Sequence, residues 1–301
     1  MKKLSGVIVP MIAPFDANDE INIAALKQLI NFLLDKGINC LYPNGTTGEM
    51  YRLSIVERKK IAEVVTEETN GRAPVVIHVG SMRMDETLEL AKHAYSIGSD
   101  GIGAITPSFF SVNDREMEEY YVAIAKAVPE DFPVYLYNIP QCSANDIKPR
   151  IINNIVGRCP NVVGIKYSFV DMMRTFDYLN IKNGEFDVVH GADYLFLSLL
   201  VMGCKGTVSG VAGVYPEPFV EVYKAFRDGD LKRGMEFQKI AAKFHKALLG
   251  GKNMAYYKEA LNRRGVEVGH MRLPQLDLNQ WEKESLHREL EMLEEELELD
   301  H

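Results

Sequence analysis

The sequence predicts an α/β protein, a closed (β/α)8 barrel of the TIM-barrel architecture followed by a C-terminal helical extension. Three observations support this fold class. Short β-branched runs recur eight times, an amphipathic segment follows each run, and the pattern turns purely helical after about residue 230. We therefore expect the barrel in residues 1–228 and the extension in residues 229–301.

The predicted strands share an apolar, β-branched character, and several are apolar on both faces, as expected when helices cover one side and a packed interior the other. In chain order they lie at residues 6–11, 40–44, 74–80, 101–106, 133–138, 162–166, 187–190 and 206–209. An open doubly wound sheet is the alternative. It would normally carry a G-x-G-x-x-G turn after its first strand, where this chain reads IVPMIAPF.

The predicted helices show apolar residues at i, i+3 and i+4 spacing, beginning with residues 23–33. Ser54 and Glu57 form a capping-box pattern ahead of a helix at residues 58–69. Further helices are expected at residues 87–97, 114–127, 193–202, 231–249, 254–264 and 278–299.

The last predicted helix carries a leucine stripe, which we interpret as packing on its own barrel rather than as a coiled contact between subunits. The stripe consists of Leu286, Leu290, Leu293 and Leu297.

Composition excludes several classes of protein. The net charge of -8 and the pI near 5.5 argue against nucleic acid or an anionic membrane as the main partner. No run approaches the ~20 apolar residues of a membrane span. Four scattered cysteines predict a reduced, cytoplasmic protein in which disulfides are not expected, namely Cys40, Cys142, Cys159 and Cys204.

The N-terminal run MKKLSGVIVPMIAPF is interpreted as the first strand rather than as a signal peptide. Pro10 and Pro14 interrupt the apolar run, and no A-x-A cleavage site follows.

Lys166 is the sharpest candidate for chemistry. Barrel enzymes build their active sites at the carboxyl ends of the strands, and Lys166 ends the apolar run Val162–Ile165. Burial lowers the pKa of an amine, and a neutral amine can attack a carbonyl to form a Schiff base. A lysine paired with a buried carboxylate is the alternative, and the run alone does not decide between them.

Two further groups fall at neighbouring strand ends. Tyr137 could relay a proton through its phenol, although a packed aromatic residue is the simpler interpretation of it alone. Thr46, Thr47 and Gly48 offer hydroxyls and open backbone N–H groups, an anion nest that runs into a helix N-terminus. A plain turn is the simpler interpretation of that loop alone. Taken together, the amine of Lys166, the phenol of Tyr137 and a loop that can bind a carboxylate suit a 2-keto acid as the substrate.

No metal and no organic cofactor is expected. The seven histidines lack metal-ligand spacing, and the contexts of His78 and His190 are typical of strand interiors. Cys142 lies just past the fifth strand, where it either touches the site or fills space as a small apolar residue.

These motifs resemble those of the dihydrodipicolinate synthase / N-acetylneuraminate lyase family of pyruvate-dependent class I aldolases. The resemblance runs nearly end to end, through G-V-I-V-P-M-I-A-P-F, N-G-T-T-G-E, I-T-P, Y-N-I-P, G-I-K and R-L-P. It implies a barrel with a helical extension, usually assembled as a homotetramer, a dimer of dimers. It further implies Lys166 as the Schiff-base lysine, Tyr137 as the proton relay, and Thr46 and Thr47 as holders of the pyruvate carboxylate. Val208 matches the position whose backbone carbonyl faces bound pyruvate.

Within the family, the sequence departs from the synthases in two places. Synthases usually carry an arginine shortly after Y-N-x-P to grip aspartate semialdehyde, and here that position is Cys142. They also usually carry a tyrosine after T-P, supplied across a subunit interface, where this chain reads Ser108-Phe109-Phe110.

The lyase branch fits the sequence better. Ser168 keeps a hydroxyl two residues after the lysine, and Asp193 matches an aspartate that contacts the sugar tail in sialic acid lyases. The glutamate expected next to it is Tyr194. Phe109, Phe110 and Tyr194 indicate a more aromatic pocket than usual. Cys142 and Ser209 complete the set of pocket candidates.

We therefore expect a lyase that cleaves or forms a C–C bond between pyruvate and an aldehyde, acting on a 2-keto-3-deoxy sugar acid or an N-acetylneuraminate-like compound. One alternative is 4-hydroxy-tetrahydrodipicolinate synthase, which condenses pyruvate with aspartate semialdehyde in lysine biosynthesis. Another is a non-catalytic keto-acid binding protein.

Overall fold

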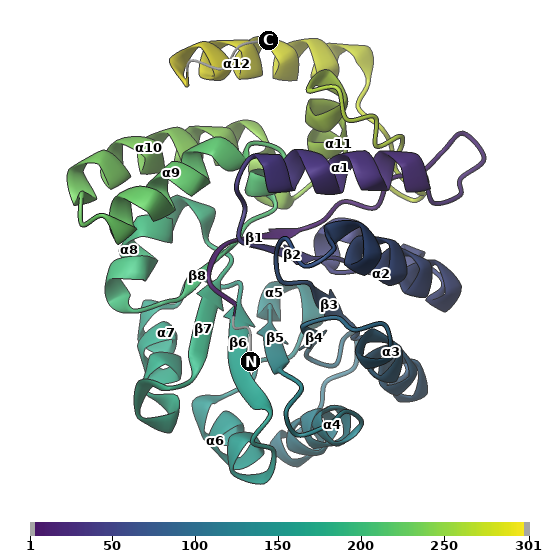
Figure 1. Ribbon diagram of the computed structural model, residues 1–301, viewed down its shortest axis with the longest axis vertical. Helices are drawn as coiled ribbons and strands as arrows, with labels where there is room; N and C mark the ends of the chain where they lie inside the picture. The colour runs from purple at the N-terminus through teal and green to yellow at the C-terminus, as the bar shows by residue number, and fades with distance from the viewer. Residues whose placement is uncertain (1–3, 298–301) are drawn as a thin grey trace.

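The computed structural model describes residues 4–297, and its centre is a ring of parallel strands surrounded by helices (Figure 1). The strands are β1 Gly6–Pro10, β2 Cys40–Tyr42, β3 Val76–His78, β4 Gly101–Ile105, β5 Val134–Asn138, β6 Val162–Tyr167, β7 Asp187–His190 and β8 Gly206–Val208. They pair in the order β2-β1-β8-β7-β6-β5-β4-β3, and every pairing is parallel.

The two end strands of that row, β2 and β3, also meet. Leu41 N donates to Pro74 O at 3.0 Å, and His78 N donates to Pro43 O at 3.1 Å. These bonds join the ends of the sheet, and the predicted (β/α)8 barrel is confirmed.

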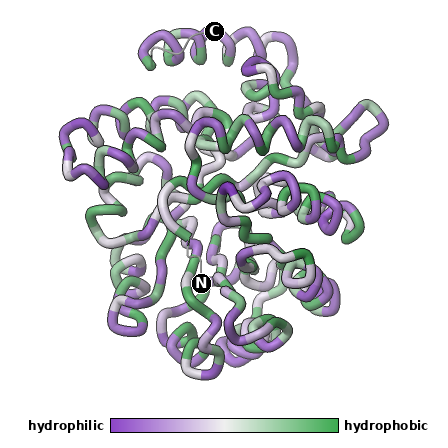
Figure 2. Tube along the Cα trace, viewed as in Figure 1, coloured by the Kyte–Doolittle hydropathy of each residue, from purple (hydrophilic) through white to green (hydrophobic). Residues whose placement is uncertain are grey.

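Helices follow the strands around the ring and then continue into the extension. They are α1 Ile23–Asp35, α2 Ile55–Thr69, α3 Met84–Ser96, α4 Asp114–Lys126, α5 Pro140–Ser143, α6 Pro149–Arg158, α7 Met172–Leu179, α8 Phe196–Met202, α9 Pro216–Arg227, α10 Leu231–Ala247, α11 Met254–Arg263 and α12 Gln280–Glu296. Short 3-10 turns are η1 Thr46–Gly48, η2 Met50–Arg52, η3 Ile181–Gly184, η4 Asp193–Leu195, η5 Val211–Gly213 and η6 Leu249–Gly251. Figure 2 shows hydrophobic and hydrophilic residues alternating along the helices, as amphipathic helices require.

Most predicted elements are found within a few residues of their expected bounds, and the differences have local causes. Strand β2 stops at Tyr42 because Asn44 adopts φ 63°, which ends the extended backbone. The capping box at Ser54 and Glu57 is confirmed, and α2 begins directly after its cap, at Ile55. The segment 193–202 forms a 3-10 turn before α8 rather than one helix. Residues 298 and 299 of the last predicted helix lie outside the described residues.

The core has two layers. One lies between the strands and the helices, and the other fills the barrel interior with side chains, so that the barrel is packed rather than hollow. The interior layer consists of Leu4, Ile8, Cys40, Tyr42, Val76, Tyr135, Val163, Val189 and Val208.

The C-terminal extension packs on its own barrel. In α10, Gln238 Oε1 accepts from Leu197 N at 2.8 Å, and its Nε2 donates to Asp193 O at 3.0 Å. In α12, Leu286, Leu290 and Leu293 are buried. The leucine stripe thus packs within its own chain, as expected, but helix α12 lies mainly on α10 and α11 of the extension rather than on the barrel.

No helix among the described residues is long and apolar enough to cross a membrane. The four cysteines are unpaired thiols, of which only Cys142 is exposed.

Two buried histidines act as neutral structural groups. His78 Nε2 accepts from Ile105 N at 3.1 Å, and its Nδ1 lies 2.9 Å from Asn44 O. Burial is the main cause that holds the pKa of His78 well below its usual range. His190 Nδ1 accepts from Ala192 N at 3.1 Å, and burial lowers the pKa of His190 to about 4. Both side chains belong to strand interiors, as expected.

His190 predicts a stability loss in acid. The unfolded chain protonates this histidine near pH 6.5, whereas the folded chain resists protonation down to about pH 4. The unfolded state therefore binds more protons in that window, and folding free energy is lost as the pH falls from about 6.5 to about 4. His190→Asn keeps a hydrogen-bond acceptor near the Nδ1 position but does not titrate. Denaturant unfolding at pH 7.5 and pH 5 should show a loss about 2 kcal/mol smaller in the variant. Equal losses in the two proteins would contradict the assignment.

Candidate active site

Lys166 lies on β6, at the carboxyl end of the barrel, and its side chain is buried. Its Cα partner across the neighbouring strand is Tyr137. Lys166 Nζ lies 3.8 Å from the ring centroid of Tyr137 and 5.0 Å from that of Tyr42. Among the described residues, no carboxylate oxygen lies within ion-pair distance of Nζ. The alternative of a carboxylate-paired lysine therefore fails, and the amine is surrounded by aromatic rings.

Tyr42 reaches this position because Gly103 leaves room for it. A Cβ at Gly103 would lie 2.1 Å from the Tyr42 hydroxyl oxygen. Complete burial is the main cause that raises the pKa of Tyr42 well above its usual range, so its phenol stays neutral beside Lys166. Sequence analysis did not identify Tyr42, because an aromatic residue in a buried strand is indistinguishable from ordinary core.

Tyr137 lies on β5 and connects the lysine to the threonine turn. Its hydroxyl oxygen is 3.3 Å from Thr46 Oγ1, so a proton can pass between the two hydroxyls. The edge of the His78 ring meets the Tyr137 ring at 89°, with the centroids 6.0 Å apart. The amine, the phenol and a threonine hydroxyl are thus brought together, as the strand-end reasoning expects.

The turn with the two threonines is held by its own backbone. Gly48 N donates to Gly45 O at 3.1 Å, and Glu49 N donates to Thr46 O at 3.1 Å. Thr46 is exposed, whereas Thr47 is buried. The expected entry of this loop into a helix N-terminus is wrong in detail, because Glu49 turns left-handed at φ 57° and η2 precedes the cap of α2.

Two of the other predicted residues, Ser168 and Ser209, follow strand ends. Ser168 is half-buried, its backbone N donates to Asn138 O at 2.9 Å, and its Oγ lies against the bare Cα of Gly191. Val208 is the last residue of β8, and Ser209 N continues the pairing to Ile8 O at 3.0 Å. Ser209 Oγ already accepts from Ala212 N at 2.9 Å, so this hydroxyl is engaged within the loop.

Asp193 is tied to the extension. Its Oδ2 lies 3.2 Å from His245 Nδ1, on α10, while its buried Oδ1 has no hydrogen-bond partner within residues 4–297. The ring of Tyr194 packs against His245 with centroids 5.1 Å apart. His245 was missed, because nothing in the sequence relates it to an aspartate 52 residues earlier.

The remaining candidates lie further out. Phe109 and Phe110 are 76% and 72% exposed and pack edge to face on each other. Cys142 is exposed, and partial burial raises the pKa of its thiol while the Lys166 charge opposes that shift. Tyr51, a residue that sequence analysis missed, donates its hydroxyl to Ser108 Oγ at 2.7 Å.

Known proteins resemble this chain over most of its length. The family model described as the dihydrodipicolinate synthetase family matches residues 3–293. A probable 2-dehydro-3-deoxy-D-pentonate aldolase of Escherichia coli K12, YjhH, is 35% identical over 234 residues, which are 77% of each chain. A 4-hydroxy-tetrahydrodipicolinate synthase of Methanopyrus kandleri is 31% identical over 292 residues, which are 97% of each chain. The solved structure of a catalytic lysine mutant of the sialic acid aldolase of Ruminococcus gnavus superposes with a TM-score of 0.93 at 25% identity, covering 99% of each chain.

We expect the threonine turn to tolerate alanine at position 45 but to lose stability when Gly48 is replaced by alanine. A Cβ at Gly48 would lie 2.9 Å from the backbone oxygen of Met11, which cannot move without shifting β1. A Cβ at Gly45 would make only a 3.4 Å contact with the ring of Tyr42. We expect Gly48→Ala to destabilise the protein by roughly 1–3 kcal/mol in denaturant unfolding, and Gly45→Ala to stay close to wild type. Comparable stabilities of the two variants would contradict the assigned turn geometry.

Proposed function

The chain belongs to the dihydrodipicolinate synthetase family, a family of pyruvate-dependent class I aldolases and lyases, and on this premise we propose that it joins or cleaves pyruvate and an aldehyde through an imine on Lys166. One observation carries the proposal. The Lys166 amine is buried against the Tyr137 ring, no carboxylate partner holds it among the described residues, and the Tyr137 hydroxyl contacts Thr46. A buried amine of this kind is a nucleophile for a carbonyl.

In the cleavage direction, Lys166 Nζ attacks the 2-keto carbon, water leaves and an imine forms. The imine accepts the electron pair of the C3–C4 bond as that bond breaks and the aldehyde departs. The resulting enamine takes up a proton at C3, and hydrolysis releases pyruvate and restores the amine. Splitting the reaction in this way replaces one difficult step by several easier ones.

Tyr137 is proposed to accept the C4 hydroxyl proton while passing its own proton on. Thr46 Oγ1, 3.3 Å away, is a hydroxyl through which that transfer can proceed. The Thr46–Gly48 turn is proposed to bind the substrate carboxylate, and the backbone carbonyl of Val208 to face the bound keto acid.

For the aldehyde half we propose a polyhydroxylated chain, so that the substrate is a 2-keto-3-deoxy sugar acid or an N-acetylneuraminate-like compound of carbohydrate metabolism. The buried Oδ1 of Asp193, without a partner in the described part of the chain, supports a role as acceptor for a substrate hydroxyl. Ser168 adds a half-buried hydroxyl beside the strand that carries Lys166. The relation to the pentonate aldolase is consistent with this choice.

The synthase reaction with aspartate semialdehyde is the alternative, because a synthase is similar over nearly the whole chain. Cys142 argues against this alternative, because a cysteine cannot donate the two parallel hydrogen bonds with which an arginine binds a second carboxylate. A non-catalytic keto-acid binding protein is a further alternative, which the assembled amine, phenol and threonine turn disfavours.

We further propose a cytoplasmic homotetramer. Unpaired thiols agree with a reducing compartment. One patch on and beside α7 exposes apolar side chains that a partner subunit could cover, namely Phe169, Val170, Met173 and Phe176. Light scattering of the purified chain measures the assembly directly.

Borohydride trapping tests the imine. With pyruvate and borohydride, the wild-type protein should gain one pyruvate-sized adduct, which a peptide map places on Lys166. Lys166→Ala should show neither adduct nor turnover, and Lys205→Ala, at an exposed lysine just before β8, should behave as wild type. Tyr137→Phe should still be trapped but turn over about 10²–10⁴-fold more slowly, because only the proton transfer is lost. An adduct on another lysine, or normal turnover by Lys166→Ala, would overturn the mechanism.

A substrate panel tests the aldehyde half. We expect pyruvate release from 2-keto-3-deoxy sugar acids or from N-acetylneuraminate, and no condensation of pyruvate with aspartate semialdehyde in a coupled assay. Asp193→Asn should raise KM for the sugar acid about tenfold, the equivalent of one hydrogen bond to a charged group, without changing pyruvate trapping. Activity with the semialdehyde alone would establish the synthase alternative, and trapping without any turnover would favour the binding protein.

A further inference from the structure

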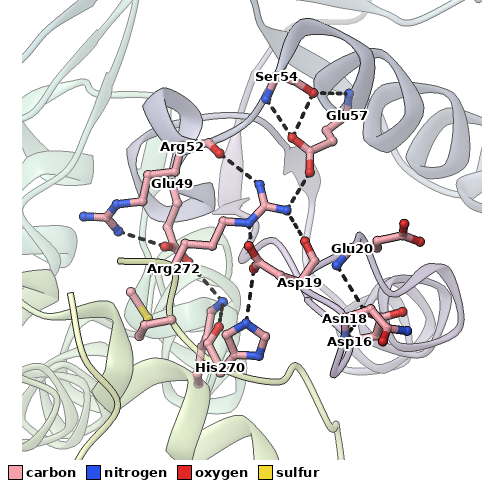
Figure 3. Close-up of polar contacts among 12 residues, drawn as sticks. Asp16, Asn18, Asp19, Glu20, Glu49, Arg52, Ser54, Glu57, His270 and Arg272 are labelled. Carbon is pink, nitrogen blue, oxygen red and sulfur yellow. Dashed lines mark hydrogen bonds and ion pairs between the residues drawn. The ribbon is translucent and has the colours of Figure 1, made fainter. Parts of the chain in front are cut away.

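Two sequence motifs, the Glu49 of G-T-T-G-E and the R-L-P at residues 272–274, have no part in the proposed chemistry. The structure brings both into one network between the threonine turn and the C-terminal extension. Figure 3 shows Glu49 and Arg52 beside the segment that carries His270 and Arg272.

Glu49 closes the threonine turn through its backbone. Its N–H donates to Thr46 O at 3.1 Å, and its left-handed conformation at φ 57° directs the chain into η2. A residue with a Cβ is strained in that conformation, so contacts of its side chain must hold it there. The conformation of Glu49 and that of the Thr46–Gly48 turn are therefore one structural unit.

The carboxylate of Glu49 is held by two cations. Lys258 Nζ, on α11, lies 3.0 Å from Oε1, and Arg52 Nη1 donates to Oε2 at 2.8 Å. The side chains of Glu49 and Lys258 are 1% and 2% exposed, so this ion pair is fully withdrawn from water.

The position of Lys258 is itself fixed by the extension. Its Nζ donates to His270 O at 2.5 Å and lies 4.2 Å from the ring centroid of Phe15. Burial lowers the pKa of Lys258, and the neighbouring Glu49 opposes that shift. Arg272 adds a second tie, because its Nη1 donates to Arg52 O at 2.9 Å and its Nη2 donates to Glu57 at 2.6 Å.

Stability does not explain a buried ion pair here. Well-packed apolar residues of similar size usually stabilise a protein at least as well as a buried pair. Helix α11 already anchors itself by buried apolar contacts through Ala255, Tyr257, Ala260 and Leu261. An apolar pair would not fix the orientation of the carboxylate. Lys258 attracts Oε1 as an ion pair from one side, and Arg52 donates a hydrogen bond to Oε2 from the other, so that the two cations together orient the carboxylate and hence the turn.

We propose that Glu49 and Lys258 are positioning residues, a buried pair through which the C-terminal extension sets the geometry of the Thr46–Gly48 turn for the substrate carboxylate. The inference rests on the proposed role of that turn. It assigns to the extension an effect on keto-acid recognition, although no residue of the pair touches the substrate.

The test compares two ketones in the full-length protein. Imine trapping with borohydride is titrated with pyruvate and with acetone, which lacks the carboxylate but forms the same kind of imine. The variants are Glu49→Gln, Lys258→Met and the double variant. Lys283→Met is the matched control, because Lys283 lies in the same extension but pairs with Glu259, at 2.9 Å, rather than with Glu49.

We expect the pair variants to need about 10²-fold more pyruvate for half-maximal trapping, because a displaced turn misplaces the carboxylate. Trapping by acetone should stay at the wild-type level, and Lys283→Met should match wild type with both ketones. The double variant is decisive, because Glu49→Gln alone leaves Lys258 buried without its carboxylate, and Lys258→Met alone leaves Glu49 with only Arg52 as a partner, so that either single substitution threatens folding.

A folded double variant with wild-type pyruvate dependence would overturn the inference. Equal losses for pyruvate and acetone would also overturn it, because they would indicate general damage rather than a displaced turn. Failure of the proposed function looks different, because the wild-type protein itself would then form no pyruvate adduct on Lys166, and this inference would fall with it.

Discussion

The structure of the barrel mouth depends on one constraint, an amine that is buried against aromatic rings and has no carboxylate within ion-pair distance in residues 4–297. The Tyr42 hydroxyl has no hydrogen-bond partner in the described part of the chain, whereas two other buried polar side chains of this region bond to the backbone. His78 is bonded through both ring nitrogens to Asn44 and Ile105. Arg58, buried on α2, donates to the carbonyls of Gly80 and His78, and burial lowers the pKa of this guanidinium to about 10. Both side chains thus bond to backbone groups rather than to an acidic side chain.

Glu49, the acidic residue nearest in sequence to the threonine turn, shows the opposite arrangement, because its charge does have partners of opposite sign. An uncompensated carboxylate at Glu49 would repel a carboxylate substrate bound at Thr46 and Thr47. Two cations, Lys258 and Arg52, hold it instead, so the charge of Glu49 is compensated. Under the proposed function, recognition of the substrate carboxylate by backbone and hydroxyl groups would rely on the ion pairs that lie behind them.

Sequence reasoning succeeded where local pattern and strand register are sufficient. Apolar runs located every strand, and because parallel strands end on the same side of a barrel, Lys166 and Tyr137 were expected together. It failed where two residues meet only through the tertiary fold. Lys258 and His245 lie in amphipathic helices whose pattern is typical of surface helices, and nothing local marks their partners, Glu49 and Asp193. Tyr42 was hidden for another reason, because its environment depends on Gly103, a strand away.

The extension therefore does more than cover one side of the barrel. Helix α10 reaches the end of β7 through Gln238 and His245, and helix α11 reaches the turn after β2 through Lys258. These two contact points correspond to the two halves of the proposed substrate, the hydroxylated tail near Asp193 and the carboxylate near Thr46. Because both loops depend on helices outside the barrel, substitutions in α10 or α11 could change recognition while the strands that carry Lys166 and Tyr137 stay the same. The chemistry then belongs to the barrel, and the choice of substrate is shared with the extension.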